Sequence, residues 1–393
     1  MKSDFMFTSE SVTEGHPDKL CDQIADAVLD RYLRQDPLAR VVTECAAANG
    51  ILFIASRFDS AAVVDIPEVA RQLIRQVGYD HEDFNADTCT VMTNLSEMPH
   101  QAMVDERSLG EEALDRIPAR NMANVFGYAC DQTPALMPLP IWLAHKLARR
   151  LAAVRLQRLL PYLAPDGKTQ VGVEYRHGRP ARLHSLTLVA SQRQGQEVSV
   201  QRLRDDLYEL VIEPVFLDEP IGPDRGTAIF VDPDGPVING GPATHSGLTG
   251  RKNAIDTYGE YSRQSESALS GKDPSRVDRV GAYAARHAAK SVVAAGLATE
   301  CEVQLTYSIG QARPVSVQVN THGSGGIGDA EIAARLAAVF DFRPAGIIRE
   351  YNLRHQPALH KGGFYRRLAA YGHVGRMDMG LPWETADKAV LLR

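Results

Sequence analysis

Two predicted helix starts in this sequence combine positive side chains with carboxylates within a few residues. Glu10 and His16 precede a helix that the sequence predicts over 17–34, and Asp18 lies in its first turn. Free backbone N–H groups and the positive end of the helix dipole attract phosphate at such a position. We expect His16 to donate to a phosphate oxygen and Asp18 to bind Mg²⁺. The alternative is an ordinary helix start, because acids are common there.

The second helix start contains Lys272, Arg276 and Asp278, at the beginning of a helix predicted over 277–296. Two cations and a carboxylate beside a glycine can bind anionic oxygens and a metal ion together. The segment is not a Walker A loop, because Glu266 stands where that motif requires glycine. A solvated helix start is the alternative here.

Two loops add further cations. The stretch 234–251 contains five glycines and ends at Arg251, which Lys252 follows. The backbone can approach a ligand closely where Cβ is missing, and a guanidinium can bind phosphate through two hydrogen bonds. Residues 165–167 predict a turn that would present Lys168 at the start of a strand. Each of these segments alone is equally typical of a surface loop.

One glycine-rich segment imitates a dinucleotide-binding motif. Residues 323–328 match G-x-G-x-x-G between a predicted strand and a predicted helix. The preceding strands have the character of a hairpin, so the βαβ unit that the motif requires is missing. We therefore predict an ordinary loop at 323–328.

Helices and hairpins must position these segments. Asn49-Gly50 predicts the turn of a hairpin over 40–58. Further helices are predicted near 66–77, 139–158, 200–212, 277–296 and 329–340, and further strands at 169–176, 183–190, 228–231, 301–308 and 314–320. Hairpins in place of βαβ crossovers favour an α+β fold with antiparallel or mixed sheets.

The elements divide the chain into three blocks. We predict domains at 1–105, 106–233 and 234–393. Residues 94–124 are polar and poorly periodic, and we predict a mobile segment or lid there, at the start of the central domain.

Composition is that of an ordinary soluble globular protein. The 393 residues carry a formal net charge of −6, which gives no overall attraction to nucleic acid or to an anionic membrane. No apolar run approaches the ~20 residues of a membrane helix, and the first ten residues lack the apolar core of a signal peptide. The five scattered cysteines form no CxxC pair. We expect a cytoplasmic protein without nucleic-acid or membrane partners.

Together these segments make the chain resemble the S-adenosylmethionine synthetase family over nearly its whole length. The matching segments, in the family's order, are FTSESVTEGHPDKLCDQIADAVLD at 7–30, FGYA at 126–129, LMPLPI at 136–141, PDGKTQV at 165–171, GGP at 240–242, GLTGRK at 247–252, DTYG at 256–259, SGKDPSRVDR at 270–279 and AYAARHAAK at 282–290. The resemblance implies three similar α/β sandwich domains. It also implies a homodimer or a dimer of dimers, with active sites between two subunits.

The implied reaction is attack of a thioether sulfur on C5′ of ATP, after which the tripolyphosphate leaves and is cleaved to phosphate and pyrophosphate. The resemblance places Asp18 and Asp278 on two Mg²⁺ ions and Glu44 on K⁺. It places Asp166 at the ribose and Ile309 beside the adenine, with Glu10 among the ATP-binding residues. The residues that would hold the triphosphate are His16, Lys168, Arg251, Lys252, Lys272 and Arg276.

Positions around the second substrate depart from the family. Arg57 stands at a family Glu and His245 at a family Asp, both of which face the ammonium of methionine. Asn121 stands at another family Asp, and Val237 at the aromatic residue that stacks on adenine. Gln101 matches the family's substrate glutamine within a diverged lid.

These departures share a direction. Acids that face an ammonium are lost, while every position predicted for triphosphate and metal keeps its charge. At an effective dielectric constant of about 20, such a change at 4 Å moves the free energy of a bound cation by several kcal/mol. We hypothesise an acceptor other than methionine in its usual pose. Arg57 and His245 would then hold a carboxylate, phosphate or sulfonate on a sulfur nucleophile, or on a non-sulfur one.

Three alternatives stay open. Methionine can bind in a shifted pose, with Asp105 and Glu106 of the predicted lid contacting its ammonium. The chain can be a catalytically inactive homologue that acts as a regulatory subunit. It can also be a nucleotide-binding or triphosphatase protein that transfers no adenosyl group.

Overall fold

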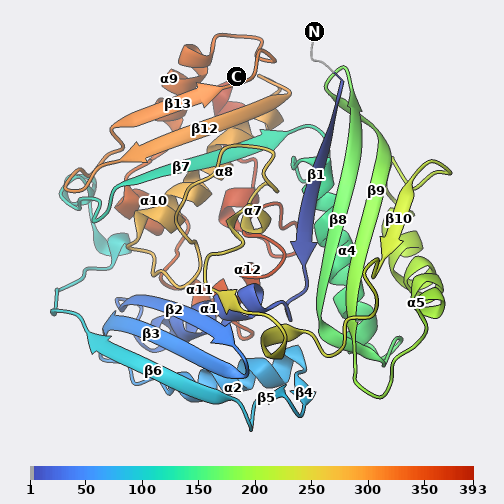
Figure 1. The fold of residues 1–393 in the computed structure, drawn as a ribbon. Coiled ribbons are helices and arrows are strands. Elements are labelled where there is room, and N and C mark those ends of the chain that lie inside the picture. Colours follow the sequence, from blue (N-terminus) through green and yellow to red (C-terminus); the bar gives the residue numbers. More distant parts are fainter. Residues whose placement is uncertain (1–3) are drawn as a thin grey trace.

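Three open sheets surround a group of helices in the computed structural model, which describes residues 4–393 (Figure 1). The first sheet has the order β1 (Phe5–Val12), β8 (Leu163–Arg176), β9 (Arg179–Gln192), β10 (Ala228–Val231). The second has the order β11 (Gly247–Leu248), β2 (Arg40–Ala48), β3 (Ile51–Asp59), β6 (Thr90–Glu97). The third has the order β13 (Ser316–Asn320), β12 (Glu300–Tyr307), β7 (Ala123–Cys130). A small ribbon joins β4 (Asp80–His81) to β5 (Phe84–Asn85).

One long helix packs against each main sheet: α1 (Pro17–Gln35) against β2, α4 (Leu139–Leu156) against β1 and β8, and α8 (Val277–Ala294) against β7 and β12. The other helices are α2 (Ile66–Val77), α3 (Glu111–Leu114), α5 (Val200–Leu207), α6 (Glu213–Phe216), α7 (Asn253–Asp256), α9 (Asp329–Val339), α10 (Pro344–Glu350), α11 (Gln356–Leu359) and α12 (Tyr365–Leu368). Sheets covered by helices in this way confirm the predicted α+β fold.

Strands from different parts of the chain share each sheet. β1 pairs antiparallel with β8, β7 with β12, and β11 with β2. These pairings bring residues 5–12 beside residues 168–175, and residues 247–248 beside the hairpin at 40–59. Charged segments that are far apart in sequence therefore meet in space. The predicted domain boundaries after residues 105 and 233 stay predictions.

Several predicted elements need correction. Residues 165–167 form no turn but lie inside β8, where the register shifts between Leu163 and Gly167. The hydroxyl of Thr13, the residue after β1, donates to the carbonyl of Pro165 at 2.7 Å. This irregular stretch of β8 therefore has a hydrogen-bond partner outside the sheet ladder. The sheets are not built from hairpins alone, because β3 pairs parallel with β6 across α2, and β9 pairs parallel with β10 across α5. The sequence analysis also missed β1, β6 and β7.

The predicted lid begins in β6 and ends in β7, so it is shorter than expected. Between these strands, Glu106 forms two hydrogen bonds of 2.7 and 2.8 Å with Arg354. Glu111 bonds to Arg349 at 2.7 Å. These ion pairs fasten residues 106–111 to the region near α10. The mobility of the segment stays a prediction.

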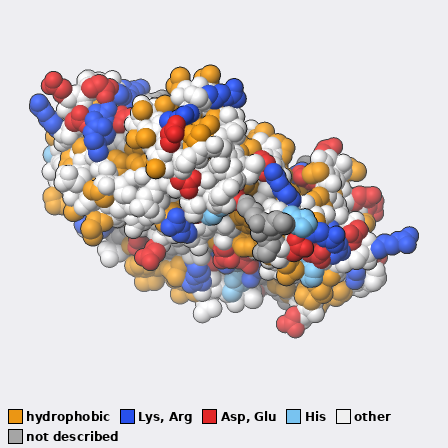
Figure 2. All heavy atoms as spheres, turned by 90° about the horizontal axis from the view of Figure 1, so that it is seen from above, with side chains coloured by type: hydrophobic (Ala, Val, Ile, Leu, Met, Phe, Trp, Pro, Cys, Tyr) orange, Lys and Arg blue, Asp and Glu red, His pale blue; other side chains and the backbone are white. Residues whose placement is uncertain are grey.

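Other expectations hold. Residues 323–328 form a loop between β13 and α9, and β13 pairs antiparallel with β12, so there is no dinucleotide-binding unit at this position. The five cysteines are free and buried. Within residues 4–393, no helix is long and apolar enough to cross a bilayer. On the face seen in Figure 2, positive, negative and apolar side chains are interspersed, so no single charge dominates it.

Candidate active site

The N-terminus of α1 holds a neutral histidine. Pro17 starts the helix, and the Nδ1 of its N-cap residue His16 accepts a hydrogen bond from the backbone N–H of Asp18 at 3.2 Å. The pKa of His16 is lowered to about 3, mainly by burial; His245, Lys168 and Lys252 contribute to the lowering, and Asp166 opposes it. Because Nδ1 accepts, the ring proton lies on Nε2, and His16 is a donor without positive charge.

The loop after β11 lies over this helix start. The buried carboxylate of Asp18 accepts from the backbone N–H of Leu248 at 3.0 Å. It lies 3.5 Å from Arg251 and 3.9 Å from Lys252, and Lys252 lies 3.4 Å from Glu10 on β1. A Cβ on Gly247 would overlap the carbonyl of Pro17, so glycine permits this close approach.

Asp166 is buried in the irregular part of β8 and is bound by His245. The Nε2 of His245 lies 2.6 Å from Oδ2 of Asp166, which also accepts from the backbone N–H of Gly241 at 2.9 Å. Burial raises the pKa of Asp166, but the hydrogen bond from His245 and the nearness of His16 lower it below its ordinary value. Oδ1 of Asp166 is buried without a hydrogen-bond partner among the described residues, which leaves it able to accept from a ligand.

His16, Asp166 and His245 also have the side-chain types of a metal site. Their ligand atoms lie within 4.8 Å of one another. However, Nδ1 of His16 already accepts from the backbone, so its Nε2 carries the proton and has no lone pair for a metal. We therefore interpret this group as a hydrogen-bonding cluster. We call His16, Asp18, Asp166, Lys168, Arg251, Lys252 and their neighbours Glu10 and His245 the first cluster.

A second cluster lies at the start of α8 and consists of Asn121, Lys272, Arg276 and Asp278. Lys272 is 3.6 Å from the buried carboxylate of Asp278, and the side-chain amide of Asn121 lies 3.3 and 3.4 Å from the oxygens of that carboxylate. Burial lowers the pKa of Lys272, with Asp278 and Glu44 opposing that shift. Arg276 is the N-cap residue of α8, and its charge also lowers the pKa of Lys272.

Glu44 and Arg57 lie on the exposed face of the second sheet, next to the second cluster. Val42 pairs with Arg57 in the β2–β3 ladder and forms an isolated bridge with Lys272. Glu44 and Val42 share a face because side chains alternate along a strand. The side chain of Arg57 is exposed and makes no hydrogen bond or ion pair within residues 4–393. A free guanidinium therefore stands beside the second cluster.

Three further predicted residues lie at the surface. The side chain of Gln101 accepts from Arg120 at 2.8 Å. Ile309 is exposed in the loop after β12. Val237 is half-buried, and its carbonyl accepts from the backbone N–H of Gln192 at 2.8 Å. None of the three contacts either cluster through a hydrogen bond in this protomer.

The two clusters are separate within one chain. Lys272 meets β2 at Val42, whereas β11 meets β2 at Ala46 and Ala47. A strand rises about 3.3 Å per residue, so roughly 13–17 Å of β2 lies between the two positions. Within residues 4–393, no ion pair joins a side chain of the first cluster to one of the second.

Asp18 was predicted from the sequence, but the buried acids that follow it on α1 were not. Asp22, Asp26 and Asp30 continue from Asp18 at four-residue spacing. Asp22 accepts from the backbone N–H of Gly250 at 2.8 Å, and Asp26 from that of Gly271 at 2.8 Å. The four-residue spacing was visible in the sequence and would have indicated one polar face of the helix.

Two lid acids proposed as contacts for an ammonium are already paired. Glu106 is buried against Arg354. Asp105 bonds to Arg107 at 2.7 Å and to His355 at 3.0 Å, and the hydrogen bond from Arg107 holds the pKa of Asp105 well below its usual range. Neither carboxylate is free to bind a second substrate in this conformation.

Buried carboxylates surrounded by lysines, arginines and a neutral histidine are typical of enzymes that act on polyphosphates. Comparisons with known proteins agree. The N-terminal, central and C-terminal domains of S-adenosylmethionine synthetase match residues 4–100, 116–237 and 239–385. An S-adenosylmethionine synthase of Gloeothece citriformis is 47% identical over 404 residues, which cover 99% of this chain and 96% of that protein. One from Trichormus variabilis is 47% identical and covers 100% of this chain and 97% of that protein.

The chain belongs to the S-adenosylmethionine synthetase family. It is therefore an enzyme, an ATP-dependent transferase.

Proposed function

We propose that this enzyme transfers the adenosyl group of ATP to the sulfur of methionine and releases the triphosphate chain, which it then cleaves. The observation that supports this proposal most is the charge pattern. Each cluster places positive charge beside a buried carboxylate: Arg251 and Lys252 lie near Asp18 in the first, and Lys272 lies near Asp278 in the second. That pattern suits a leaving group of about four negative charges with its metal ions.

The residues of the chain would act mainly on the leaving group. The thioether sulfur supplies an electron pair to C5′, the C5′–O bond breaks, and its electrons leave on the triphosphate oxygen. No proton must be removed from the thioether, so the transfer step needs no general base; the later cleavage of the triphosphate consumes one water, whose proton is released to solvent or to a phosphate oxygen. His16 would donate a hydrogen bond from Nε2 to a phosphate oxygen without adding charge. Lys168, Lys252 and Lys272 would neutralise the developing negative charge.

The carboxylates fit magnesium. Mg²⁺ prefers oxygen ligands, and proteins often hold it through one or two carboxylates plus substrate phosphates. Asp18 and Asp278 are single buried carboxylates beside lysines, so phosphate oxygens would complete each shell. Bound Mg²⁺ would neutralise the triphosphate and orient it. Glu44, an exposed carboxylate on β2, would bind K⁺.

We propose that a second copy of the chain completes each active site. Roughly 13–17 Å of β2 separates the positions at which the two clusters meet that strand, and no ion pair joins the clusters within residues 4–393. The outer face of the second sheet exposes Ile51, Phe53, Met92 and Leu248, a set of apolar side chains that suits an interface. A twofold axis at this face would bring the first cluster of one protomer to the second cluster of its partner.

The acceptor is the open part of the proposal. Arg57 is free beside the second cluster, which favours a second candidate, an acceptor that bears an anion and lacks an ammonium. His245 supports that candidate less directly, because its ring is hydrogen-bonded to Asp166 and would have to contact both Asp166 and the acceptor. The alternative of lid acids as ammonium contacts has lost support, because Glu106 is paired with Arg354.

One assay separates these functions. The full chain is incubated with ATP, Mg²⁺ and K⁺, with methionine, with anionic thioethers or thiols, or with no acceptor, and adenosyl products and phosphates are followed by mass spectrometry. S-adenosylmethionine at a normal turnover would support the first proposal and refute the altered acceptor. An adenosyl product formed only with an anionic acceptor would do the reverse. Phosphate release with no adenosyl product under any condition would refute both.

A further inference from the structure

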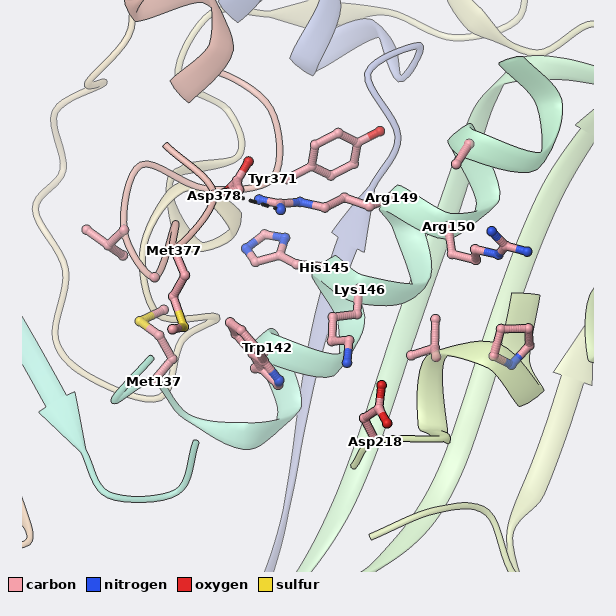
Figure 3. Close-up of a pocket in the computed structure, with 15 residues that line it drawn as sticks. Met137, Trp142, His145, Lys146, Arg149, Arg150, Asp218, Tyr371, Met377 and Asp378 are labelled. Carbon is pink, nitrogen blue, oxygen red and sulfur yellow. Dashed lines mark ion pairs between the residues drawn. The ribbon is translucent and has the colours of Figure 1, made fainter. Parts of the chain in front are cut away.

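A cavity of about 590 Å³ lies between α4, α6 and residues 371–378 (Figure 3). Helix α4 lines it at positions 142, 145, 146, 149, 150 and 153, which is the spacing of one side of a helix. The volume lies within the range of about 300–1,000 Å³ that small-molecule sites occupy. None of the residues in the first or second cluster lines this cavity, so it is separate from the candidate active site.

One end of the cavity is apolar. Figure 3 shows Trp142, Met137 and Met377 together at this end, and Val374 also lines the cavity. The indole N–H of Trp142 donates to Glu219 at 3.0 Å, which fixes the ring. A flat aromatic surface with two flexible thioethers accommodates an apolar body of variable shape.

The charged side chains near this apolar end include Lys146, Glu219 and Asp218. Lys146 lies 2.6 Å from Glu219, so the carboxylate of Glu219 already neutralises the charge of Lys146. Asp218 lies near Lys146 and away from Arg149 (Figure 3). Arg150 points toward the opposite wall, and its Nε donates to the carbonyl of Leu210 at 2.7 Å.

The other end holds an incompletely paired guanidinium. Asp378 binds Arg376 through both oxygens at 2.9 and 3.0 Å, and lies 3.4 Å from Arg149. One carboxylate therefore serves two guanidinium groups. The Nε of Arg149 is buried and has no hydrogen-bond partner among the described residues, and its guanidinium lies 5.4 Å from the ring centre of Tyr371. A partly exposed guanidinium that shares its carboxylate partner with a second arginine favours an additional anionic ligand.

Further positive charge adjoins this end. A second cavity of about 400 Å³ shares Arg149 and Tyr371 with the first and adds Arg366 and Arg367. Neither of these two arginines forms an ion pair within residues 4–393. Glu14 also lines this second cavity and is already 2.9 Å from Arg155. The arginine end therefore has more positive than negative charge, although the chain as a whole is acidic.

We propose that this cleft is a second ligand site, which binds a small amphipathic anion with an aromatic body. The body would lie against Trp142 and Met377, and a phosphate, sulfonate or carboxylate would bind Arg149 between Arg366 and Arg367. The site is independent of the proposed function, because it shares no residue with either cluster.

The aromatic sulfonate 8-anilinonaphthalene-1-sulfonate is the probe that tests this site on the full chain. The chain has two tryptophans, of which Trp142 lines the cavity and Trp383 is fully buried against Tyr283. Binding is followed both by probe emission and by quenching of tryptophan emission. Tripolyphosphate with Mg²⁺ is present in a parallel titration to occupy the candidate active site.

We expect Arg149→Gln and Met377→Glu each to weaken probe binding at least tenfold. The matched controls Arg202→Gln, which removes an exposed charge from α5, and Met377→Leu should stay within twofold of wild type. Tripolyphosphate should not displace the probe, and Trp142→Phe should remove most of the quenching. Equal affinity in all variants, displacement by tripolyphosphate, or no binding by the wild-type chain would each overturn the proposal. Aliphatic and aromatic phosphates and carboxylates then compete against the probe to identify the preferred anion.

Discussion

The buried ion pair between Asp26 on α1 and Arg279 on α8 holds the loop of Lys272 in place. Arg279 donates to the two oxygens of Asp26 at 2.7 and 2.8 Å, and both side chains are almost fully buried. Asp26 also accepts from the backbone N–H of Gly271 at 2.8 Å, and Arg279 donates to the carbonyl of Lys272 at 3.1 Å. We predict that Arg279→Met destabilises the fold and disorders this loop.

The expected loss of unfolding free energy follows from the carboxylate of Asp26, which is left buried without its partner. Removing one partner of a buried ion pair costs about 3–5 kcal/mol, because the other charge stays buried alone. Arg279 also contacts the ring of Tyr365 at 4.3 Å, and that contact is lost too. The double variant Asp26→Asn/Arg279→Met removes the orphaned charge, so we expect it to recover about 1–3 kcal/mol relative to Arg279→Met.

Urea unfolding of wild type, Arg279→Met and the double variant, followed by circular dichroism, measures these differences. The KM for ATP, measured in parallel, should rise in Arg279→Met because Lys272 loses its support. If Arg279→Met changed the unfolding free energy by less than about 1 kcal/mol, or if the double variant were no more stable than the single one, the reasoning would be refuted.

Three further predictions concern titration and specificity. Burial lowers the pKa of His16 to about 3, so the native state keeps the ring neutral while the unfolded chain protonates it below about pH 6.5. The contribution of His16 to stability is therefore complete above pH 7 and falls toward pH 3. The unfolding free energy of wild type relative to His16→Asn should drop by about 2 kcal/mol from pH 8 to pH 5, and a constant difference would contradict this pKa. His245→Ala should raise the pKa of Asp166 and cost about 1.5 kcal/mol of stability in urea unfolding at pH 8, whereas an unchanged midpoint would mean that the 2.6 Å hydrogen bond does not form. Arg57→Glu should lower the KM for methionine about tenfold or more if Arg57 faces the ammonium, and steady-state kinetics showing no change would exclude Arg57 from the acceptor pocket.

Local signals in the sequence predicted the elements well. The apolar four-residue spacing in 17–34 and the turn at Asn49-Gly50 correspond to α1 and to the β2–β3 hairpin. Both signals work because they depend on neighbouring residues. The glycine-rich loop at 323–328 was also predicted, since the strands before it pair as a hairpin.

The remaining features depend on contacts between distant residues. Nothing within residues 5–12 indicates that β1 pairs with β8, because strand partners are fixed by tertiary packing. The pairing of β8 with β9, which also depends on tertiary packing, places Asp166 inside a strand where the local composition predicts a turn. The pairing of Glu106 with Arg354, which removes a predicted ligand, joins residues that no local pattern connects. Sequence therefore indicated which residues carry charge in the candidate site, but not which of them lie together.

The central claim is that two separated clusters, one from each of two protomers, surround a single triphosphate. Mixing two inactive variants tests it most directly, with Lys252→Ala disabling the first cluster and Lys272→Ala the second. After subunit exchange at equal amounts, half of the dimers are mixed, and each mixed dimer has one intact site out of two. We predict recovery of about a quarter of the wild-type activity. No recovery, with mixed dimers demonstrated by native mass spectrometry, would contradict the claim.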